Sequence, residues 1–203
     1  CTLCLDRRNV WPSLRYKCYR DSRFSTLPLA INVALHRMLG TWKKHVDTFI
    51  VLSEFQRQQM KQVGFPEEKV FVKPNFILNA SLPETKPQKE AAAIFVGRLS
   101  AEKGIKTLVE AWKLWGNQAP ELRIIGDGPL RHLVTSEQSI RYLGQLSRDE
   151  TLQEIAKAKL LVLPSEWYET FGMVVIEAFS QGTPAVVSNL GALPSLVQDG
   201  VTG

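Results

Sequence analysis

The chain has 203 residues, of which 44% are hydrophobic and 22% are charged, a composition typical of soluble globular proteins. The sequence has no run of about 18 apolar residues, which excludes a membrane-spanning helix, and its start lacks the apolar core of a signal peptide. The length allows one large domain or two small ones. Because the chain begins with Cys rather than Met and ends at Val-Thr-Gly without a terminating helix or strand, we expect a fragment of a longer protein.

The net charge of +5 is unevenly distributed. Residues 1–77 contain 13 Lys and Arg against 6 Asp and Glu, whereas residues 78–203 contain 12 against 14. A basic first part suits an anionic partner such as a phospholipid surface, a lipid-linked phosphate or nucleic acid. The alternative is a solvated basic face without a partner.

All three cysteines, Cys1, Cys4 and Cys18, lie near the start of the chain. Their spacing supplies three of the four ligands of a zinc-ribbon-like site, so they form a partial zinc set. The alternative is three reduced cysteines, or an adventitious disulfide, in a cytosolic protein.

The first part of the chain alternates helices and strands. Residues 1–21 have no clear period and are interpreted as a loop or small knuckle. In residues 22–46, apolar side chains recur every three or four positions, which predicts one long amphipathic helix whose apolar stripe faces the core rather than a membrane. A strand at 48–52, a helix at 54–63 with Ser53 as its N-cap, and a strand at 69–72 follow. This alternation predicts a parallel α/β arrangement.

Residues 79–90 are polar and contain prolines, so they are the predicted linker between a first domain, residues 1–78, and a second domain, residues 91–203. Five apolar strands are expected in the second domain, at 91–96, 122–125, 140–143, 160–163 and 184–187, with helices between them. A capping box, Ser147 with Glu150, opens one of these helices. The pattern predicts a doubly wound, Rossmann-like parallel sheet.

Candidate ligand-binding residues follow the strands of this predicted sheet, at the edge where such sheets bind ligands. Arg98 and Lys103, after the first strand, are cations that can bind phosphate. After the fourth strand comes Glu169-Thr-Phe-Gly-Met-Val-Val-Ile-Glu177, with two carboxylates eight residues apart around a helix N-terminus. Helix N-termini bind anions and carboxylates accept hydrogen bonds from hydroxyls, so a ligand that is part phosphate and part sugar fits.

These motifs together resemble the family 4 retaining glycosyltransferases of the GT-B fold. The matching stretches are Val96-Gly-Arg-Leu-Ser-Ala-Glu-Lys-Gly104, Gly126-Asp-Gly-Pro129, Pro164-Ser with the motif 169–178, and Gly182-Thr-Pro-Ala-Val-Val-Ser188. The resemblance covers essentially all of residues 91–203. Val51-Leu-Ser-Glu-Phe and Val72-Lys-Pro-Asn75 are similar to the end of that family's acceptor domain, and residues 1–46 resemble a bacterial subgroup.

The resemblance implies two Rossmann-like domains, with a nucleotide-diphosphate sugar held mainly by the second, and sugar transfer with retention of anomeric configuration. It implies that Arg98, Lys103 and Glu169 form the catalytic set, in which the two cations bind the diphosphate and Glu169 binds sugar hydroxyls. Glu177 would bind the ribose. The implied donor-binding set also includes Gly97, Leu146 near the base, and the backbone of Phe171, Gly172, Met173 and Val174. No metal cofactor is expected, because neither an Asp-x-Asp motif nor a Walker lysine occurs; the cations and the helix N-terminus would stabilise the leaving diphosphate.

The chain departs from the family pattern in two respects. The N-terminal half of the acceptor domain and the C-terminal end are absent, and Ser195 replaces the usual Glu of a Gly-x-x-Pro-Glu motif. We therefore expect this piece to be weakly active or inactive by itself. The implied partners are the donor and a saccharide or lipid-linked acceptor, in the cytoplasm, with peripheral contact of residues 1–77 at the inner membrane face and no nucleic acid. The alternative is a nucleotide-sugar-binding module without transfer activity.

Overall fold

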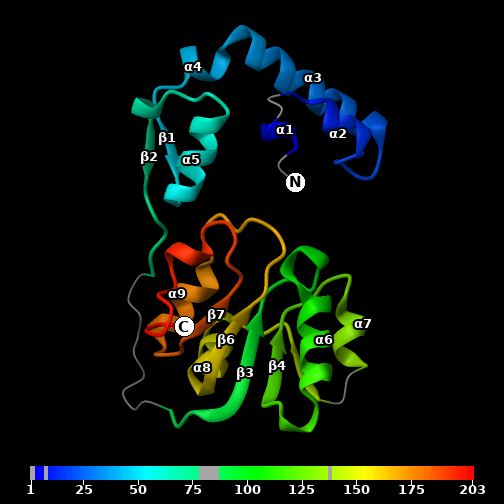
Figure 1. The fold of residues 1–203 in the computed structure, drawn as a ribbon, viewed down its shortest axis with the longest axis vertical. Helices are drawn as coiled ribbons and strands as arrows, with labels where there is room; N and C mark the ends of the chain where they lie inside the picture. Colours follow the sequence, from blue (N-terminus) through cyan, green and yellow to red (C-terminus); the bar gives the residue numbers. More distant parts are fainter. Residues whose placement is uncertain (1–2, 7–8, 78–86, 137–138) are drawn as a thin grey trace. The chain divides into compact units, whose positions relative to one another are not determined.

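The computed structural model describes residues 3–6, 9–77, 87–136 and 139–203 (Figure 1). The chain divides into two compact units, Cys1–Pro74 and Asn75–Gly203. Residues 79–86 of the predicted linker lie outside the described residues. The predicted domain boundaries therefore stay predictions, and each unit is described by itself.

In its described residues, the first unit contains a two-stranded parallel sheet, five α-helices and a 3-10 helix. Strand β1 (Phe49–Val51) pairs with β2 (Val70–Val72), which follows the short 3-10 helix η1 (Glu67–Lys69). Helix α5 (Glu54–Gln62) contacts both strands and begins where the Ser53 hydroxyl accepts a hydrogen bond from the Gln56 amide, as predicted for an N-cap. The remaining helices are α1 (Leu3–Asp6), α2 (Trp11–Arg15), α3 (Arg23–Leu39) and α4 (Thr41–His45).

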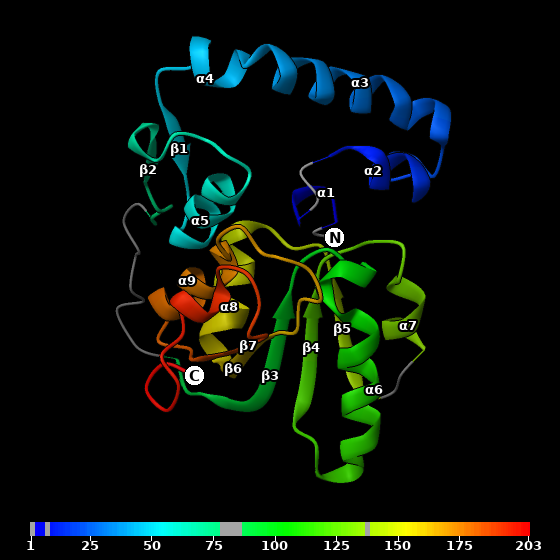
Figure 2. The same cartoon turned by 45° about the horizontal axis from the view of Figure 1, so that its top comes forward.

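Three expectations for the first unit are wrong. Described parts of residues 1–21 form α1 and α2 rather than only a loop. The predicted helix over 22–46 is two helices, because Gly40 adopts the left-handed conformation (φ +67°) that ends α3. The stripe of α3 does not face a core in this structure, since Phe24 is 90% and Met38 is 78% exposed. Helix α2 lies along α3, whose buried residues are only Thr26 and Ala30 (Figure 2).

The second unit is built on the five-stranded parallel sheet that the sequence predicts, in the order β5-β4-β3-β6-β7. Its strands are β3 (Glu90–Val96), β4 (Glu121–Ile125), β5 (Ile140–Gly144), β6 (Ala158–Leu163) and β7 (Ala185–Val187). Central β3 pairs with β4 through Ala93 opposite Leu122, and with β6 through Ile94 opposite Leu161. These strands are buried, which explains their continuous apolar sequences.

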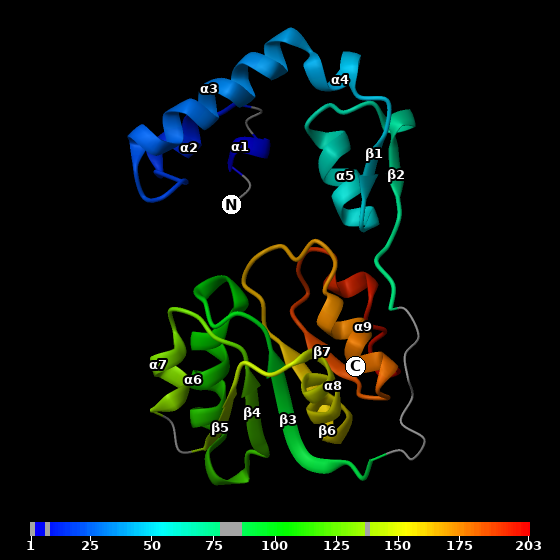
Figure 3. The same cartoon turned by 180° about the vertical axis from the view of Figure 1, so that it is seen from behind.

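Helices cover both faces of this sheet. Helix α6 (Ile105–Trp115) contacts α7 (Arg131–Thr135), and α8 (Arg148–Lys157) contacts α9 (Met173–Ser180), and the two pairs lie apart in Figures 1 and 3. Right-handed connections place the two pairs on opposite faces, because the chain moves first towards β5 and then back towards β7. The capping box of α8 is present as predicted. Short 3-10 helices complete the unit: η2 (Ala101–Lys103), η3 (Gly116–Gln118) and η4 (Leu193–Ser195).

A buried arginine organises the amino-terminal part of the sheet. The Arg123 side chain on β4 is 5% exposed and forms ion pairs with Glu90, Glu121 and Glu154. Its pKa is raised: burial has the largest single effect and would lower the pKa, but the hydrogen bonds and charges of Glu121 and Glu90 together outweigh burial. The cluster compensates a buried charge away from the carboxyl ends of the strands, so its role is structural.

Candidate functional site

The strand order creates a crevice between β3 and β6. The chain leaves β3 towards β4 on one side, and it leaves β6 towards β7 on the other. In open α/β sheets, ligands bind where the strand order reverses in this way, beyond the carboxyl ends of the strands. Two segments follow the carboxyl ends of these strands, residues 97–104 after β3 and residues 164–172 after β6 (Figure 1).

Gly104 allows these two segments to approach each other. It has a φ of +71°, and a Cβ added there would lie 1.9 Å from the carbonyl oxygen of Pro164. The Glu166 amide also donates a hydrogen bond to the carbonyl of Glu102, at 3.0 Å. Only glycine provides both the conformation and the space, so backbone packing fixes the width of the crevice.

The crevice brings together Lys103 and Glu169, which lie 66 positions apart in the sequence. The Lys103 ammonium forms an ion pair with Glu169 Oε1, and the two side chains are 27% and 17% exposed. The Ser165 hydroxyl donates a hydrogen bond to the same oxygen at 2.7 Å. Among the described residues, Lys103 and Ser165 both contact Oε1 of Glu169. The other oxygen, Oε2, can therefore accept a hydrogen bond from a ligand hydroxyl.

The N-terminus of α9 lies directly after this carboxylate. Gly172 precedes the helix with a φ of +96°, and no side chain caps it. Phe171 is buried, whereas Met173 is 38% exposed. The free amides of such a helix start, together with the helix dipole, favour an anion. The sequence thus correctly predicted a helix start between the two glutamates.

Glu177 lies in α9, beside the first residue of α8. The Arg148 Nε is 3.7 Å from Glu177 Oε1, and their side chains are 61% and 20% exposed. Leu146, half-buried in the segment after β5, packs against the core of the unit. Leu146 and Glu177 therefore both lie near the start of α8, Leu146 directly before it in the chain and Glu177 through its contact with Arg148.

Arg98 and Gly97 lie in the segment after β3. Arg98 is exposed, and the structure records no contact between its side chain and Glu169 among the described residues. The Gly97 amide donates to the carbonyl of Ile125 at 3.0 Å, which joins the carboxyl ends of β3 and β4. The structure therefore joins Lys103 directly to Glu169, whereas Arg98 lies at the same edge of the sheet, where its charge interacts with that of Glu102.

A cavity of about 330 Å³ opens at the Lys103–Glu169 pair. Its lining residues are Glu102, Lys103, Trp167, Tyr168 and Glu169. Such a volume is at the lower end of small-molecule sites. The combination of an ammonium, two carboxylates and two aromatic rings suits a ligand that carries negative charge, hydroxyls and an apolar face.

Sequence reasoning missed five residues of this site. Ser165 and Arg148 contact the two predicted glutamates, and Glu102, Trp167 and Tyr168 line the cavity. The sequence signal that could have identified Ser165 is its position: it directly follows Pro164, which ends the strand, and it stands four residues before Glu169. The partner of Glu177 depends on how α8 packs against α9, which no local pattern specifies.

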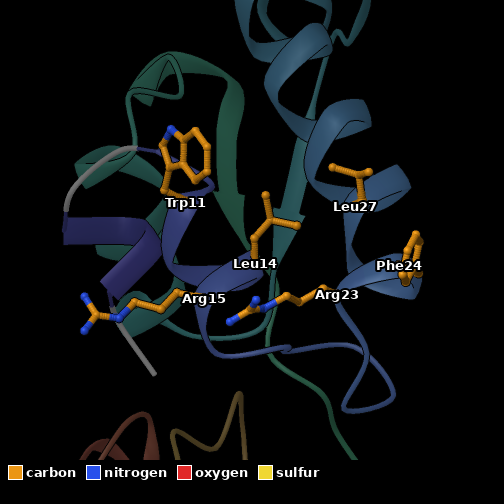
Figure 4. A pocket seen from close by; sticks show the side chains of 6 residues that line it. All are labelled: Trp11, Leu14, Arg15, Arg23, Phe24 and Leu27. Atoms are coloured by element: carbon orange, nitrogen blue, oxygen red, sulfur yellow. The ribbon is translucent and has the colours of Figure 1, made fainter.

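The first unit contains a different hollow, with a volume of about 500 Å³ (Figure 4). Apolar side chains and two arginines line it: Trp11, Leu14, Arg15, Arg23, Phe24 and Leu27. Cys4 and Cys18 are free thiols, and Cys1 lies outside the described residues. Among the described residues, no three His, Cys, Asp or Glu side chains cluster as metal ligands, and no helix is long and apolar enough to cross a bilayer.

Comparison with known proteins identifies the family. A family profile described as "Glycosyl transferases group 1" matches residues 80–203, which is more than half of the chain. The chain belongs to the group 1 glycosyl transferases. Sulfoquinovosyl transferase SQD2 of Arabidopsis thaliana is 32% identical over 211 residues, covering 96% of this chain and 36% of the relative. Glycogen synthase of Mycobacterium tuberculosis is 35% identical over 133 residues, covering 61% of this chain and 31% of the relative.

Solved structures support the fold of this group 1 chain. Anabaena Alr3699/HepE in complex with UDP-glucose has a TM-score of 0.70 at 22% identity, covering 94% of this chain and 55% of that structure. The apo form of the lipopolysaccharide outer core galactosyltransferase WaaB has a TM-score of 0.60 at 24% identity, covering 78% and 48%. The likeness confirms the predicted GT-B fold, with a Rossmann-like sheet and part of a second α/β unit. The chain spans about a third of the length of the curated relatives it matches.

Proposed function

We propose that this chain is part of a glycosyltransferase that moves a sugar from a nucleotide-diphosphate sugar to an acceptor with retention of anomeric configuration. The observation that carries the proposal is the Lys103–Glu169–Ser165 cluster at the switch point of the sheet, next to the N-terminus of α9. A cation, a carboxylate and free amides lie side by side there, as a sugar diphosphate requires. Family membership points in the same direction, as does the similarity to Alr3699/HepE, whose structure is a complex with UDP-glucose.

In this proposal each part of the donor has its own residues. Lys103 and Arg98 bind the diphosphate, and the amides of residues 171–174 hold the sugar and its phosphate. Glu169 accepts hydrogen bonds from sugar hydroxyls through Oε2, since Oε1 is held by Lys103 and Ser165. Glu177 accepts hydrogen bonds from the ribose hydroxyls, and Leu146 and Gly97 lie beside the nucleotide.

The proposed transfer needs no metal cofactor. When the glycosidic bond to the diphosphate breaks, negative charge builds up on the leaving group. Lys103, Arg98 and the positive end of the α9 dipole are placed to stabilise that charge. Glu169 is ion-paired to Lys103, so its assigned role is to position the sugar rather than to act as a free nucleophile.

A donor screen on the intact protein tests the proposal. Calorimetry with UDP-glucose, GDP-mannose and ADP-glucose should identify a donor whose affinity falls about 10- to 100-fold in Lys103→Ala, the scale of a hydrogen bond to a charged group. Lys106→Ala is the matched control, because Lys106 is three residues on and 75% exposed. Equal affinities in the two variants, or no binding of any donor, would contradict the assignment.

Product analysis tests the reaction itself. Turnover should persist in EDTA, and the anomeric coupling constant of the product should match that of the donor sugar. An inverted product or loss of turnover in EDTA would contradict retention or metal independence. Donor binding without any transferred or hydrolysed sugar would favour the alternative, a nucleotide-sugar-binding module.

A second proposal concerns the acceptor side: the first unit contacts an anionic membrane, where a lipid-linked acceptor would be found. The exposed stripe of α3 and the apolar hollow lined by Arg15 and Arg23 favour it (Figure 4). Apolar side chains enter the acyl boundary while arginines bind lipid phosphates. A saccharide acceptor in solution would not need this surface.

Vesicle flotation of the intact protein tests the membrane contact. Vesicles that contain phosphatidylglycerol should bind more protein than phosphatidylcholine alone, and Phe24→Ser should weaken binding about tenfold, since burial of one aromatic side chain stabilises binding on that scale. Leu114→Ser is the control, because Leu114 is 89% exposed on α6 of the second unit. Equal binding by both variants, or none by the parent protein, would contradict the membrane contact through α3.

A further inference from the structure

Trp167 forms an aromatic wall of the cavity at the Lys103–Glu169 pair. Its side chain is 56% exposed, and it shares the lining of the 330 Å³ cavity with Lys103 and Glu169. A large apolar ring exposed beside charged groups contributes little to the core, and water contact with that ring is unfavourable. Its position therefore suggests a ligand surface.

The backbone on both sides of Trp167 is held in place. Before it, the Glu166 amide donates to the carbonyl of Glu102 at 3.0 Å, and the Thr107 hydroxyl donates to the Glu166 carboxylate. After it, the amide of Ala192 donates to the carbonyl of Glu169 at 3.0 Å. The indole is thus attached to a short segment whose backbone is fixed at both ends, so the attachment point of the wall is set before a ligand binds. Such preorganisation lowers the entropy cost of binding.

The chemistry of this wall selects a sugar ring over a phosphate. The face of an indole carries negative partial charge, which repels an anion and attracts the slightly positive C–H groups on the face of a pyranose. A pyranose also has hydroxyls at its edge, where Lys103 and Glu169 Oε2 can bind them. The cavity offers both kinds of contact within the volume expected for a small ligand.

We propose that Trp167 stacks on a pyranose ring bound in this cavity and thereby determines which sugars the protein accepts. The ring is either the donor's sugar or a saccharide acceptor, because both present the same C–H face. The assignment of the ring to a donor or an acceptor rests on the proposed function. The stacking itself does not require a nucleotide.

Saturation-transfer NMR of the intact protein with methyl α-D-glucopyranoside, methyl α-D-galactopyranoside and methyl α-D-mannopyranoside tests the stacking directly. At least one glycoside should show its strongest saturation at C–H protons of one ring face, and mannitol, which has hydroxyls but no ring, should show none. Trp167→Ala should weaken the glycoside about tenfold, the scale of aromatic stacking, and Trp167→Phe should restore most of the affinity. Trp115→Ala is the control, because Trp115 is 53% exposed at the end of α6 and lies outside this cavity.

Calorimetry then separates the two sources of the ring. If Trp167→Ala weakens the binding of UDP-glucose, GDP-mannose or ADP-glucose but not of the matching free nucleotide, the stacked ring is the sugar of the donor. If it weakens only the binding of the methyl glycoside to nucleotide-loaded protein, the stacked ring belongs to the acceptor. Unchanged affinity in every titration would overturn the stacking proposal, even if nucleotide binding confirms the proposed function. Trp167-dependent glycoside binding without any nucleotide binding would support stacking while the proposed function fails.

Discussion

Replacing Gly104 by alanine tests whether the close approach of the two crevice segments supports both the fold and the site. The added Cβ would lie 1.9 Å from the Pro164 carbonyl oxygen, whereas contacts become ordinary only beyond 3.4 Å, so one backbone must move by about 1.5 Å. The left-handed conformation of a non-glycine residue costs about 1–2 kcal/mol. Overpacking adds about 1–3 kcal/mol, which gives a loss of roughly 2–5 kcal/mol in the free energy of unfolding.

Gly182→Ala is the matched control for this substitution. Gly182 belongs to the same unit and has a φ of +64°, but no atom lies within 4 Å of an added Cβ. Gly182→Ala should therefore lower the free energy of unfolding only by the cost of the left-handed conformation, about 1–2 kcal/mol. Urea denaturation monitored by circular dichroism gives both values, and hydrogen exchange of α6, which begins at Ile105, reports the local effect of Gly104→Ala.

The site should respond together with the fold. Lys103 directly precedes Gly104, so a shift of this segment separates its ammonium from Glu169. Donor affinity in Gly104→Ala should fall at least tenfold under conditions where the protein is still folded, and Gly182→Ala should bind normally. Equal unfolding free energies for the two variants, or full donor affinity in Gly104→Ala, would refute the idea that backbone contact fixes the crevice.

Three further substitutions have defined outcomes. Ser165→Ala removes the 2.7 Å hydrogen bond to Glu169 and should weaken donor binding about tenfold, while binding of the free nucleotide, measured by calorimetry, stays unchanged. Arg123→Met leaves Glu90 and its neighbours without their shared cation, so urea denaturation should show a loss of about 2–4 kcal/mol; a loss like that of an exposed residue would contradict the structural role. The hydrogen bond from Arg123 lowers the pKa of Glu90 from 4.5, so this pair's contribution to stability is complete above pH 4.5 and is lost as the pH falls below that value. Glu90→Gln should therefore make the unfolding free energy depend less steeply on acid pH, and an unchanged pH profile would contradict this assignment.

The sheet of the second unit could be predicted because each local signal agrees with the global fold. Its central strands β3 and β4 are buried on both faces and therefore appear as nearly continuous apolar sequences, such as the one around Ile94. The helices between them carry their own start signals, of which the Ser147–Glu150 capping box is the clearest. Element bounds differ from the predictions by only one or two residues, as fraying helix ends and short strands allow.

The long helix of the first unit shows where the sequence pattern is insufficient. A repeat of three and four positions indicates an apolar face, but it does not identify what covers that face. Phe24 and Met38 follow the repeat and are nevertheless largely exposed. The helix also ends at Gly40, although the repeat continues to Trp42 and beyond. A glycine in the left-handed conformation overrides the periodicity, because it stops the backbone hydrogen-bond ladder.

The site was predictable in its parts but not in its contacts. Arg98, Lys103, Glu169 and Glu177 each follow a predicted strand or helix start, so their common edge could be inferred from the sequence. The pairing of Lys103 with Glu169 depends on β3 and β6 being neighbours, and this adjacency is a property of the whole sheet. Ser165 was missed for a different reason: its contact with Glu169 is local, but it forms only when the Glu169 carboxylate turns back towards the end of β6.

The Lys103–Glu169 pair also limits what the crevice can bind. A free phosphate would meet Lys103 and the amides of α9, but the adjacent carboxylate of Glu169 would repel it. A neutral sugar would use the carboxylate and leave the cation and the helix start without an anion. A ligand whose hydroxyls and phosphate are joined satisfies both groups at once, since an ammonium has three donors and the carboxylate keeps Oε2 available. In the proposed donor site, the pair would therefore favour a sugar phosphate over either of its halves, which is the discrimination that a nucleotide-diphosphate sugar requires.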